Sequence, residues 1–516
     1  MLVSLAMIVK NEEATLAHCL ESVKPIVDEM VIVDTGSTDR TIEIAKGFGA
    51  SVHHFQWCDD YSAARNESLK HCNGEWVLII DADEAIDPLD YEKIKNVCTS
   101  PFADAYNLTH RHYLPSASIT NQGVSAVPNT SDYSEGKGLP FFADNPVCRL
   151  ARAFNGLTFW GRIHEDIAPW LSEHGKTVKP LDAVIHHYGK MFIDRDDQKL
   201  NYYYMLAAQE AERFPDRLKT QYNLLQMALP AKKWDVALRS ADECIKISPT
   251  ADSFVLLGRS LALHELGRFE EAVSCFDLLL SQEPGHAMAL SGKAMSLVAL
   301  GNIGEGRQTL LKAIALNPNY VSGHLCLAQL EMKNGDMAAA RKVLSDAINA
   351  MPGEPKLYDQ LINIELYENR PQQAASLAAR AMAMCPNTGQ GRGSSREGWQ
   401  SIIAQYNCQL AESELTKGNG DAAKQILLNA LESAPMAPKL YDLLIKIEMD
   451  RGNLPQAARH ALKGIQNCQT SSPLWYRLAA AYLSKAGERH KAKSILEIGV
   501  KAFPGDTDLI RLMGII

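Results

Sequence analysis

The pattern of apolar and polar positions changes near residue 200. Up to about residue 90, short apolar runs of strand length alternate with segments whose apolar residues recur at the spacing of a helix face. This alternation predicts an α/β domain with a parallel sheet and crossover helices. The expected strands are residues 2–9, 30–33, 51–55 and 76–80, and the expected helices are residues 12–23, 41–48 and 62–71.

Polar residues follow several of these apolar runs, at Lys10, Asp34, Asp81 and Asp83. In open α/β sheets ligands bind beyond the carboxyl ends of the strands, where these residues are expected to lie. Residues i and i+2 of an extended segment share a face, so Asp81 and Asp83 can point at one divalent ion such as Mg²⁺ or Mn²⁺. The alternative is a solvated junction before a helix that begins near Asp87.

Beyond about residue 230 the strand pattern stops and a helical repeat begins. Where a turn between paired helices is expected, Gly or Asn, and at the first turn Lys, is followed five residues later by a small residue. The positions 267, 301, 335 and 369 keep a period of 34 residues. The pairs are Lys232 with Ala237, Gly267 with Ala272, Gly301 with Gly306, Gly335 with Ala340, Asn369 with Ala374, Gly418 with Ala423, Gly452 with Ala457 and Gly487 with Ala492.

This helix-turn-helix period resembles the tetratricopeptide repeat and predicts seven or eight repeats in a curved solenoid. The step from 369 to 418 is longer than one repeat. Residues 387–398, which are rich in Gly, Ser and Arg, are expected to form a mobile loop there.

Composition narrows the classes of function. The chain is 46% hydrophobic and 22% charged, as in ordinary globular proteins, and its formal charge of −9 argues against a general nucleic-acid binder. Its eleven cysteines are spread singly, which predicts reduced thiols and a cytoplasmic location. No run reaches the ~18 to 20 apolar residues of a membrane span, so no integral membrane segment is expected.

Five motifs in order resemble the family 2 glycosyltransferases, which have the GT-A fold. They are MIVKNEE at 7–13, VIVDTGSTDRT at 31–41, DDYSAARNESL at 59–69, WVLIIDADE at 76–84 and GRIHED at 161–166. More narrowly, the chain resembles the bacterial branch that joins such a domain to tetratricopeptide repeats, including peptide S-glycosyltransferases that modify bacteriocins. We therefore expect a GT-A domain at 1–200, connecting helices at 201–230 and a repeat domain at 231–516.

The resemblance implies a site for a nucleotide-sugar donor. Asp34 would meet the base and ribose, with Thr35 in place of a second acid common in the family; the alternative for Asp34 is a helix-capping turn. Arg65 would bind the diphosphate with its fork of donors; the alternative is an ion pair with an acid such as Asp59 or Asp60. The expected donor-binding residues are Lys10, Asp34, Thr35, Arg65 and Asp81.

The resemblance also implies a metal ion, Mn²⁺ or Mg²⁺. Asp83 would be its ligand, and Asp81 would contact the ion, its bound water or the ribose. The apolar segment 183–185 leads into two histidines on opposite faces, and we favour His187 over His186 as a further ligand. The alternative is a structural histidine near a strand end.

An inverting transfer needs a base that takes the proton of the acceptor. Glu165 is the expected base and Asp166 the second candidate, while His164 would position the acceptor or the donor phosphate. Either acid could instead be a surface carboxylate at a helix start. Residues 113–146, including the Ser- and Gly-rich 116–138, are expected to form a long acceptor-side loop that orders on binding.

The function expected from these residues is an inverting, metal-dependent glycosyltransferase. Its donor would be a nucleotide sugar, with UDP the usual nucleotide, and its acceptor a polypeptide such as flagellin or a secreted peptide held by the repeats. One alternative is lipopolysaccharide or capsule assembly, with the repeats recruiting a partner. Another is an inactive repeat-protein scaffold. A homodimer is left open.

Overall fold

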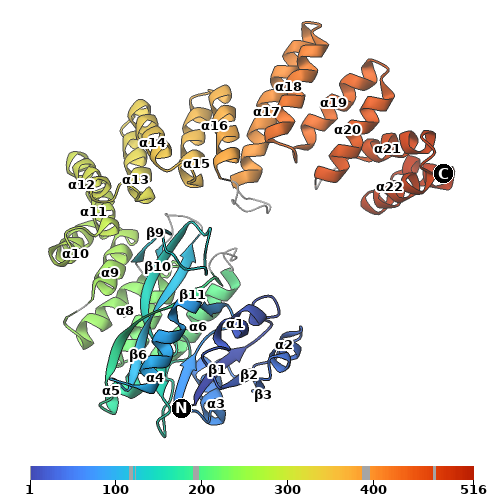
Figure 1. Cartoon of the computed structure of the whole chain (residues 1–516). Helices are drawn as coiled ribbons and strands as arrows, with labels where there is room; N and C mark the ends of the chain where they lie inside the picture. Colours follow the sequence, from blue (N-terminus) through green and yellow to red (C-terminus); the bar gives the residue numbers. More distant parts are fainter. Residues whose placement is uncertain are drawn as a thin grey trace. The chain divides into compact units, whose positions relative to one another are not determined.

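The computed structural model of the chain describes residues 2–114, 120–121, 124–189, 197–250, 252–385, 395–468 and 472–515. The chain divides into two compact units, Met1–Cys326 and Leu327–Ile516. The first unit contains one large sheet and the first helical repeats, and the second is entirely helical (Figure 1). The α/β domain and the helical repeat array that the sequence predicts are both confirmed.

The sheet begins as predicted with four parallel strands, in the order β3, β2, β1 and β4. Beyond β4 it becomes mixed, because β10 runs antiparallel to β4 and β6, while β11 runs parallel to β6 and antiparallel to β5. The strands are β1 (Val3–Val9), β2 (Glu29–Asp34), β3 (Ser51–His54), β4 (Trp76–Ile79), β5 (Glu84–Ile86), β6 (Ala105–Leu114), β10 (Phe141–Arg152) and β11 (Val178–His187).

Helices cover both faces of this sheet because its central strands are apolar on both sides. Leu5, Met7 and Leu78 pack in the core beneath α1 and α4, whereas Val77 and Ile79 face the other way, toward α3 and α5. This division follows the two-residue period of side chains along a strand. The helices are α1 (Leu16–Val23), α2 (Thr41–Gly47), α3 (Tyr61–His71), α4 (Tyr91–Thr99) and α5 (Ala168–Glu173).

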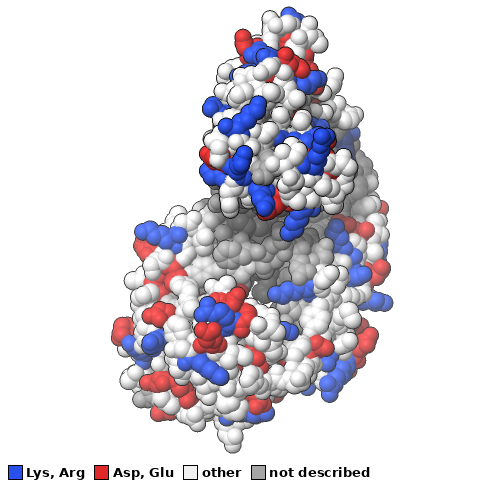
Figure 2. All heavy atoms as spheres, turned by 90° about the vertical axis from the view of Figure 1, so that its right-hand side faces the viewer, with Lys and Arg blue, Asp and Glu red and all other residues white. Residues whose placement is uncertain are grey.

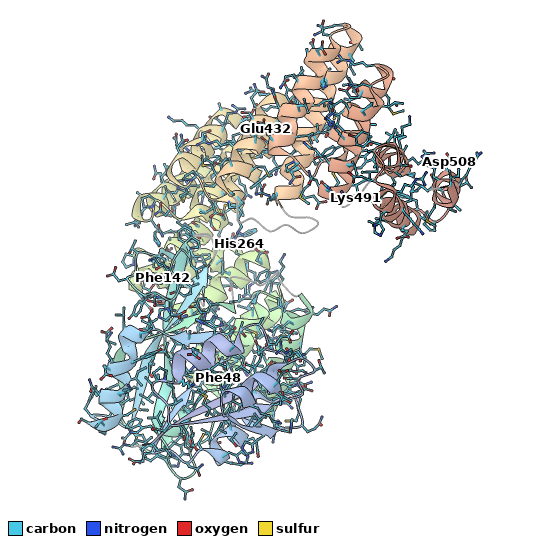
Figure 3. All side chains as sticks on the ribbon, turned by 45° about the vertical axis from the view of Figure 1, so that its right-hand side comes forward. Phe48, Phe142, His264, Glu432, Lys491 and Asp508 are labelled. Atoms are coloured by element: carbon cyan, nitrogen blue, oxygen red, sulfur yellow. The ribbon has the colours of Figure 1, made fainter. Side chains whose placement is uncertain are left out.

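The expected long loop at 113–146 is wrong at its two ends and is interrupted by short strands. Strand β6 continues to Leu114 and β10 already begins at Phe141; Figure 3 labels the next residue of β10, Phe142. Between them lie the short strands β7 (Thr120–Asn121), β8 (Val124–Ser125) and β9 (Val127–Pro128), and β9 pairs with β10. Residues 115–119 and 122–123 lie outside the described residues. Residues 129–140 are described and contain no strand, so a loop remains between β9 and β10.

The helical repeats confirm the 34-residue pattern and explain its residues. Every turn residue of the pattern has a positive φ, from +55° at Lys232 to +86° at Gly301, and Gly adopts this conformation without a steric cost. The small residue five positions later is buried, as at Ala340. At Gly306 a Cβ atom would lie 2.7 Å from the side chain of Val298, so the two helices of that repeat cross too closely for a side chain.

The repeat helices run in antiparallel pairs from α7 to α22, and α6 precedes them. They are α6 (Asp197–Arg213), α7 (Leu218–Ala228), α8 (Trp234–Ile247), α9 (Ser253–Glu265), α10 (Phe269–Gln282), α11 (Ala287–Ala299), α12 (Ile303–Leu316), α13 (Val321–Lys333), α14 (Met337–Ala350), α15 (Pro355–Tyr367), α16 (Pro371–Met384), α17 (Ser395–Thr416), α18 (Gly420–Ser433), α19 (Pro438–Asp450), α20 (Leu454–Asn467), α21 (Pro473–Lys485), α22 (Arg489–Ala502) and α23 (Thr507–Ile515).

The predicted mobile loop at 387–398 is wrong at its end, because residues 395–398 form the first turn of α17. Residues 387–394 lie outside the described residues. Within the described part of the chain, no helix combines the length and the apolar character needed to cross a bilayer. Lys and Arg side chains alternate with Asp and Glu over the face shown in Figure 2.

Candidate active site

Asp81 lies just beyond the end of β4, between two arginine side chains. Arg65 of α3 donates a hydrogen bond from Nη2 to Oδ1, and Arg149 of β10 donates from Nη2 to Oδ2 at 3.0 Å. Both guanidinium groups are buried. Burial alone would raise the pKa of Asp81, but the charges of Arg65 and Arg149 outweigh it and hold the pKa well below its ordinary range. Asp81 is therefore a fixed anion.

Arg65 connects this strand end to the loop that carries the expected base. Its Nε donates to Oε1 of Glu165 at 3.0 Å. The alternative of an ion pair with Asp59 or Asp60 is wrong, because Asp60 instead caps α3 through the amide of Ala63. The remaining Nη1 of Arg65 is buried and has no hydrogen-bond partner among the described residues. A buried, unpaired guanidinium nitrogen suits an oxygen of a diphosphate.

Arg65, Asp81, Glu84, Arg149 and Glu165 form one cluster of charged side chains, which we call the ion cluster. Two of its members, Arg149 and Glu84, were not identified from the sequence. Glu84 is buried; its Oε2 accepts from the backbone amide of Asp81 at 2.8 Å, and its Oε1 accepts from Arg149 at 3.2 Å. Burial raises the pKa of Glu84, and the Arg149 charge reverses this and lowers it. The acid directly after the Asp-Ala-Asp motif was a usable signal for Glu84. Arg149 gives none, because it is a single arginine in the middle of a strand.

The predicted metal ligands Asp83 and His187 lie side by side, with Oδ2 of Asp83 3.2 Å from Nε2 of His187. A Cβ atom at Gly189 would lie 2.5 Å from that carboxylate oxygen and 2.9 Å from the same nitrogen. Only glycine therefore leaves this space open. An oxygen and an imidazole nitrogen suit Mn²⁺ better than Mg²⁺, so these residues fit a divalent ion of that kind.

His186 points away from Asp83. The ring is buried, and its Nδ1 pairs with the Tyr113 hydroxyl at 2.8 Å. His187 is thus the histidine that the structure brings to the acids. Burial would lower the pKa of His187, but its contact with Asp83 outweighs this and raises it.

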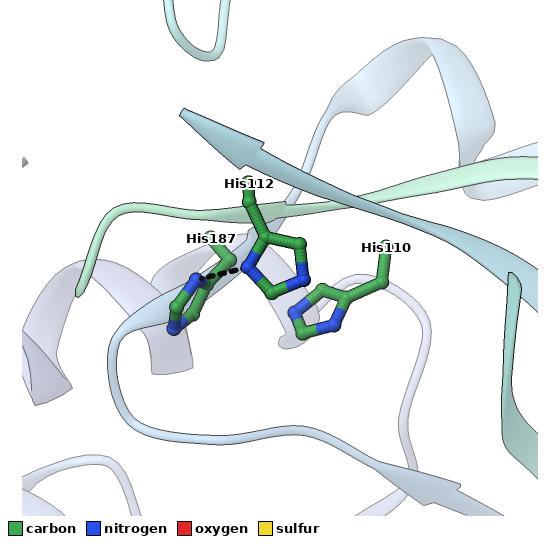
Figure 4. Close-up of side chains that lie close together, drawn as sticks. All are labelled: His110, His112 and His187. Atoms are coloured by element: carbon green, nitrogen blue, oxygen red, sulfur yellow. Dashed lines mark hydrogen bonds between the residues drawn. The ribbon is translucent and has the colours of Figure 1, made fainter. Parts of the chain in front are cut away.

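Two further histidines, which sequence reasoning also missed, lie against His187. His110 and His112 come from β6, and all three rings offer nitrogens within 4.8 Å of one another (Figure 4). Nδ1 of His112 is 2.9 Å from Nδ1 of His187. The spacing of His110 and His112 by two residues puts them on one face of a strand and was a usable signal.

On the donor side, Asp34 ends β2 and is buried. Its carboxylate accepts from the backbone amides of Gly36 at 3.1 Å and Ser37 at 3.0 Å, which closes a turn but does not cap α2, because that helix begins only at Thr41. Thr35 is also buried, and its hydroxyl donates to the carbonyl of Val9 at 3.1 Å. Lys10 is exposed at the same edge of the sheet. The contacts of Asp34 and Thr35 stabilise the turn within the protein, and none of them identifies a bound nucleotide.

In the 161–166 loop, the two candidate bases differ. Asp166 pairs its backbone with Trp160, and its side chain accepts from the amide of Ala168 at the start of α5, as the helix-start alternative expects. Glu165 instead reaches Arg65, with only 15% of its side chain exposed. His164 is exposed and has a φ of +50°. The structure therefore brings Glu165, and not Asp166, into the ion cluster.

Helices α6 and α7 hold this loop, a role that the sequence did not reveal. The buried Glu210 of α6 accepts from the backbone amide of Arg162 at 2.8 Å, and the buried Asn223 of α7 donates to the carbonyl of Ile163 at 3.2 Å. The two hydrogen bonds are made by the backbone of Arg162 and Ile163, the residues that precede His164 and Glu165. Both helices therefore position the loop as parts of the first unit.

The buried His186 makes a pH-dependent contribution to stability. Burial lowers its pKa to about 4, below the value of about 6.5 in an unfolded chain. Between these values the unfolded chain binds more protons, so stability falls as the pH decreases from 6.5 toward 4. We predict that lowering the pH from 7 to 5 reduces the free energy of unfolding of both proteins, and that this reduction is about 2 kcal/mol smaller for the His186→Asn variant than for the native chain.

Urea unfolding at the two pH values measures this difference. The exposed His174 provides the control, and His174→Asn should behave like the native chain. An equal pH dependence in His186→Asn and the native chain would contradict the prediction.

Comparisons with known proteins find family matches in both parts of the chain. Residues 4–126 match the family described as Glycosyl transferase family 2, and residues 257–321 and 291–355 match the tetratricopeptide repeat. A solved tetratricopeptide repeat protein from Parabacteroides merdae aligns with a TM-score of 0.31 and 19% identity over 49% of this chain and 94% of its own.

Two curated relatives match part of the chain. A TPR repeat-containing protein from Synechococcus elongatus is 43% identical over 106 residues, which are 20% of this chain and 26% of the relative. The SPbeta prophage-derived glycosyltransferase SunS from Bacillus subtilis is 34% identical over 97 residues, which are 18% of this chain and 23% of SunS. The matches thus span about a quarter of each relative. Residues 4–126 of this chain thus match glycosyltransferase family 2, and tetratricopeptide repeats follow them.

Proposed function

We propose that the chain is an inverting glycosyltransferase that moves a sugar from a nucleotide-sugar donor, with UDP as the expected nucleotide, to a polypeptide side chain. The observation that carries this proposal is the convergence of Asp81, Asp83, Arg65 and Glu165 at one edge of the sheet in a family 2 domain. An anion-binding arginine, a metal-binding acid and a base are the groups that this reaction requires.

On the donor side, Asp83 and His187 would hold Mn²⁺ or Mg²⁺. When bound, the ion neutralises the charge that develops on the leaving diphosphate. The unpaired Nη1 of Arg65 would donate to a phosphate oxygen, while Asp81 keeps the guanidinium in place. Lys10, Asp34 and Thr35 border the same edge and would contact the nucleoside or its phosphates.

On the acceptor side, Glu165 would take the proton from the hydroxyl or thiol as that atom attacks the anomeric carbon from the face opposite the diphosphate. Arg65 orients the Glu165 carboxylate through its Nε. Asp166 remains the second candidate, although its side chain caps α5. His164, exposed beside Glu165, would position the acceptor.

The polypeptide acceptor is supported by the repeats, because helical repeat arrays bind extended peptides and protein surfaces. Helices α6 and α7 hold the Glu165 loop, so the start of the helical region is already part of the catalytic unit. All eleven cysteines are free thiols, which supports a reducing compartment such as the cytoplasm. A lipopolysaccharide or capsule acceptor is the alternative within the same chemistry.

The first prediction from this proposal concerns the donor. With Mn²⁺ present, the chain should slowly hydrolyse a nucleotide sugar, and Asp83→Asn should lower that rate by about 100-fold or more, because charge on the leaving diphosphate is no longer neutralised. A screen of nucleotide sugars by release of the nucleotide measures this. Asp132→Asn, an exposed position outside the site, is the control and should retain the native rate.

No hydrolysis of any nucleotide sugar by the native chain would argue for an inactive scaffold. Equal rates in the native chain and Asp83→Asn would contradict the assigned role of Asp83.

The second prediction concerns the acceptor. Mass spectrometry should find a co-expressed acceptor polypeptide heavier by one or more sugar residues. Removal of residues 327–516 should abolish this addition but leave donor hydrolysis intact, because Met1–Cys326 forms a compact unit that contains the whole site. Sugar transfer to a saccharide acceptor with no polypeptide product would instead favour the lipopolysaccharide or capsule alternative.

A further inference from the structure

Strand register brings three imidazole rings together behind the Asp83 carboxylate. His187 of β11 pairs with His112 of β6 on one side and with Glu84 of β5 on the other. His110 lies two residues before His112 and faces the same side. The rings come from two adjacent strands near the β5 edge of the sheet, and all three are largely buried. Their positions are therefore set by backbone hydrogen bonds rather than by a loop.

The separations between the rings are close to those around a single metal ion. With metal–nitrogen distances of 2.0–2.1 Å, ring centres on one ion lie about 4.6 to 5.3 Å apart, and ligand nitrogens about 3.0 to 3.4 Å apart. The observed ring centres are 4.1, 4.7 and 5.1 Å apart, and the Nδ1 atoms of His112 and His187 are 2.9 Å apart. The ring centres of His110 and His112 have to separate by about half an ångström, and the ligand nitrogens, which lie within 4.8 Å of one another, have to converge on the ion.

Carboxylates occupy the outer nitrogens of two of the rings. Oε1 of Glu84 lies 2.8 Å from Nε2 of His110, and Oδ2 of Asp83 lies 3.2 Å from Nε2 of His187. A carboxylate beside the second ring nitrogen raises the basicity of a metal-binding histidine. Nδ1 of His187 faces His112, on the side of the ring away from Asp83, and is available to an ion there.

The charges around the rings also favour a cation. The buried Glu84 carboxylate and Asp83 lie in direct contact with two of them. The facing Nδ1 atoms of His112 and His187 can make their short contact only if one of them carries a proton, and a metal ion can replace that proton. Three nitrogen ligands suit borderline transition ions, whereas Mg²⁺ prefers oxygen.

We propose that His110, His112 and His187 form a transition-metal site that binds one Zn²⁺-class ion through one ring nitrogen of each histidine. This three-nitrogen site is distinct in its ligands from the Asp83 position of the donor ion, although His187 borders both. The proposal does not require glycosyl transfer, since it concerns the binding of a metal to the chain alone.

Zinc binding to the metal-stripped full-length chain tests this proposal. Calorimetric titration without nucleotide should give one high-affinity Zn²⁺ per chain, bound at least about ten times more tightly than Mn²⁺. Loss of a residue that hydrogen-bonds to a metal ligand typically weakens metal binding by about 10- to 100-fold. His110→Asn and His112→Asn remove a ligand itself, so each should weaken Zn²⁺ binding by at least that factor. The control is the double variant His53→Asn/His71→Asn, which removes a stacked pair with ring centres 3.6 Å apart and should bind like the native chain.

X-ray absorption of the Zn²⁺-loaded native chain provides a second measurement that needs no variant. Three imidazole ligands are expected. One imidazole or none, unchanged affinity in both His110→Asn and His112→Asn, or loss of binding in the His53/His71 variant would each overturn the proposal. Because no donor is present, these results are independent of whether the chain hydrolyses a nucleotide sugar.

Discussion

The site depends on the ion cluster in which Asp81 lies between Arg65 and Arg149. The two arginines are buried, so removal of one partner leaves an uncompensated charge, at a cost of about 3–5 kcal/mol for a buried pair. The same contacts fix the geometry of four separate segments, namely the end of β4, helix α3, strand β10 and, through Glu165, the 161–166 loop. Donor-binding and proton-accepting groups are thereby held in one rigid arrangement.

Strand register supplies the other half of the site. Because β11 lies between β5 and β6, His187 is placed between Glu84 and His112, and the turn after β4 brings Asp83 to its Nε2. Gly189 keeps that position accessible. The donor-ion site and the three-histidine site therefore share one ring but present different ligand atoms to a cation, oxygen and nitrogen in one and nitrogen alone in the other.

The parts of this picture that could be predicted have local causes. Asp81, Asp83 and Arg65 stand in short motifs next to recognisable strands and helices, and the repeat turns stand out because only Gly or Asn readily adopts their positive φ. Arg149 and Glu210 could not be placed in the same way, because they reach the site through contacts between segments that are far apart in the chain. The strands within 113–146 were hidden for a similar reason, since their partners and not their polar composition determine their structure.

The central claim is that Glu165, oriented by Arg65, accepts the proton of the acceptor at this sheet edge. The most direct test is the rate of sugar transfer and the affinity for the donor in Glu165→Gln and Asp166→Asn. The claim predicts that Glu165→Gln transfers about 10²- to 10⁴-fold more slowly while donor affinity changes little, and that Asp166→Asn loses far less. Near-native transfer by Glu165→Gln, with the large loss in Asp166→Asn, would contradict it.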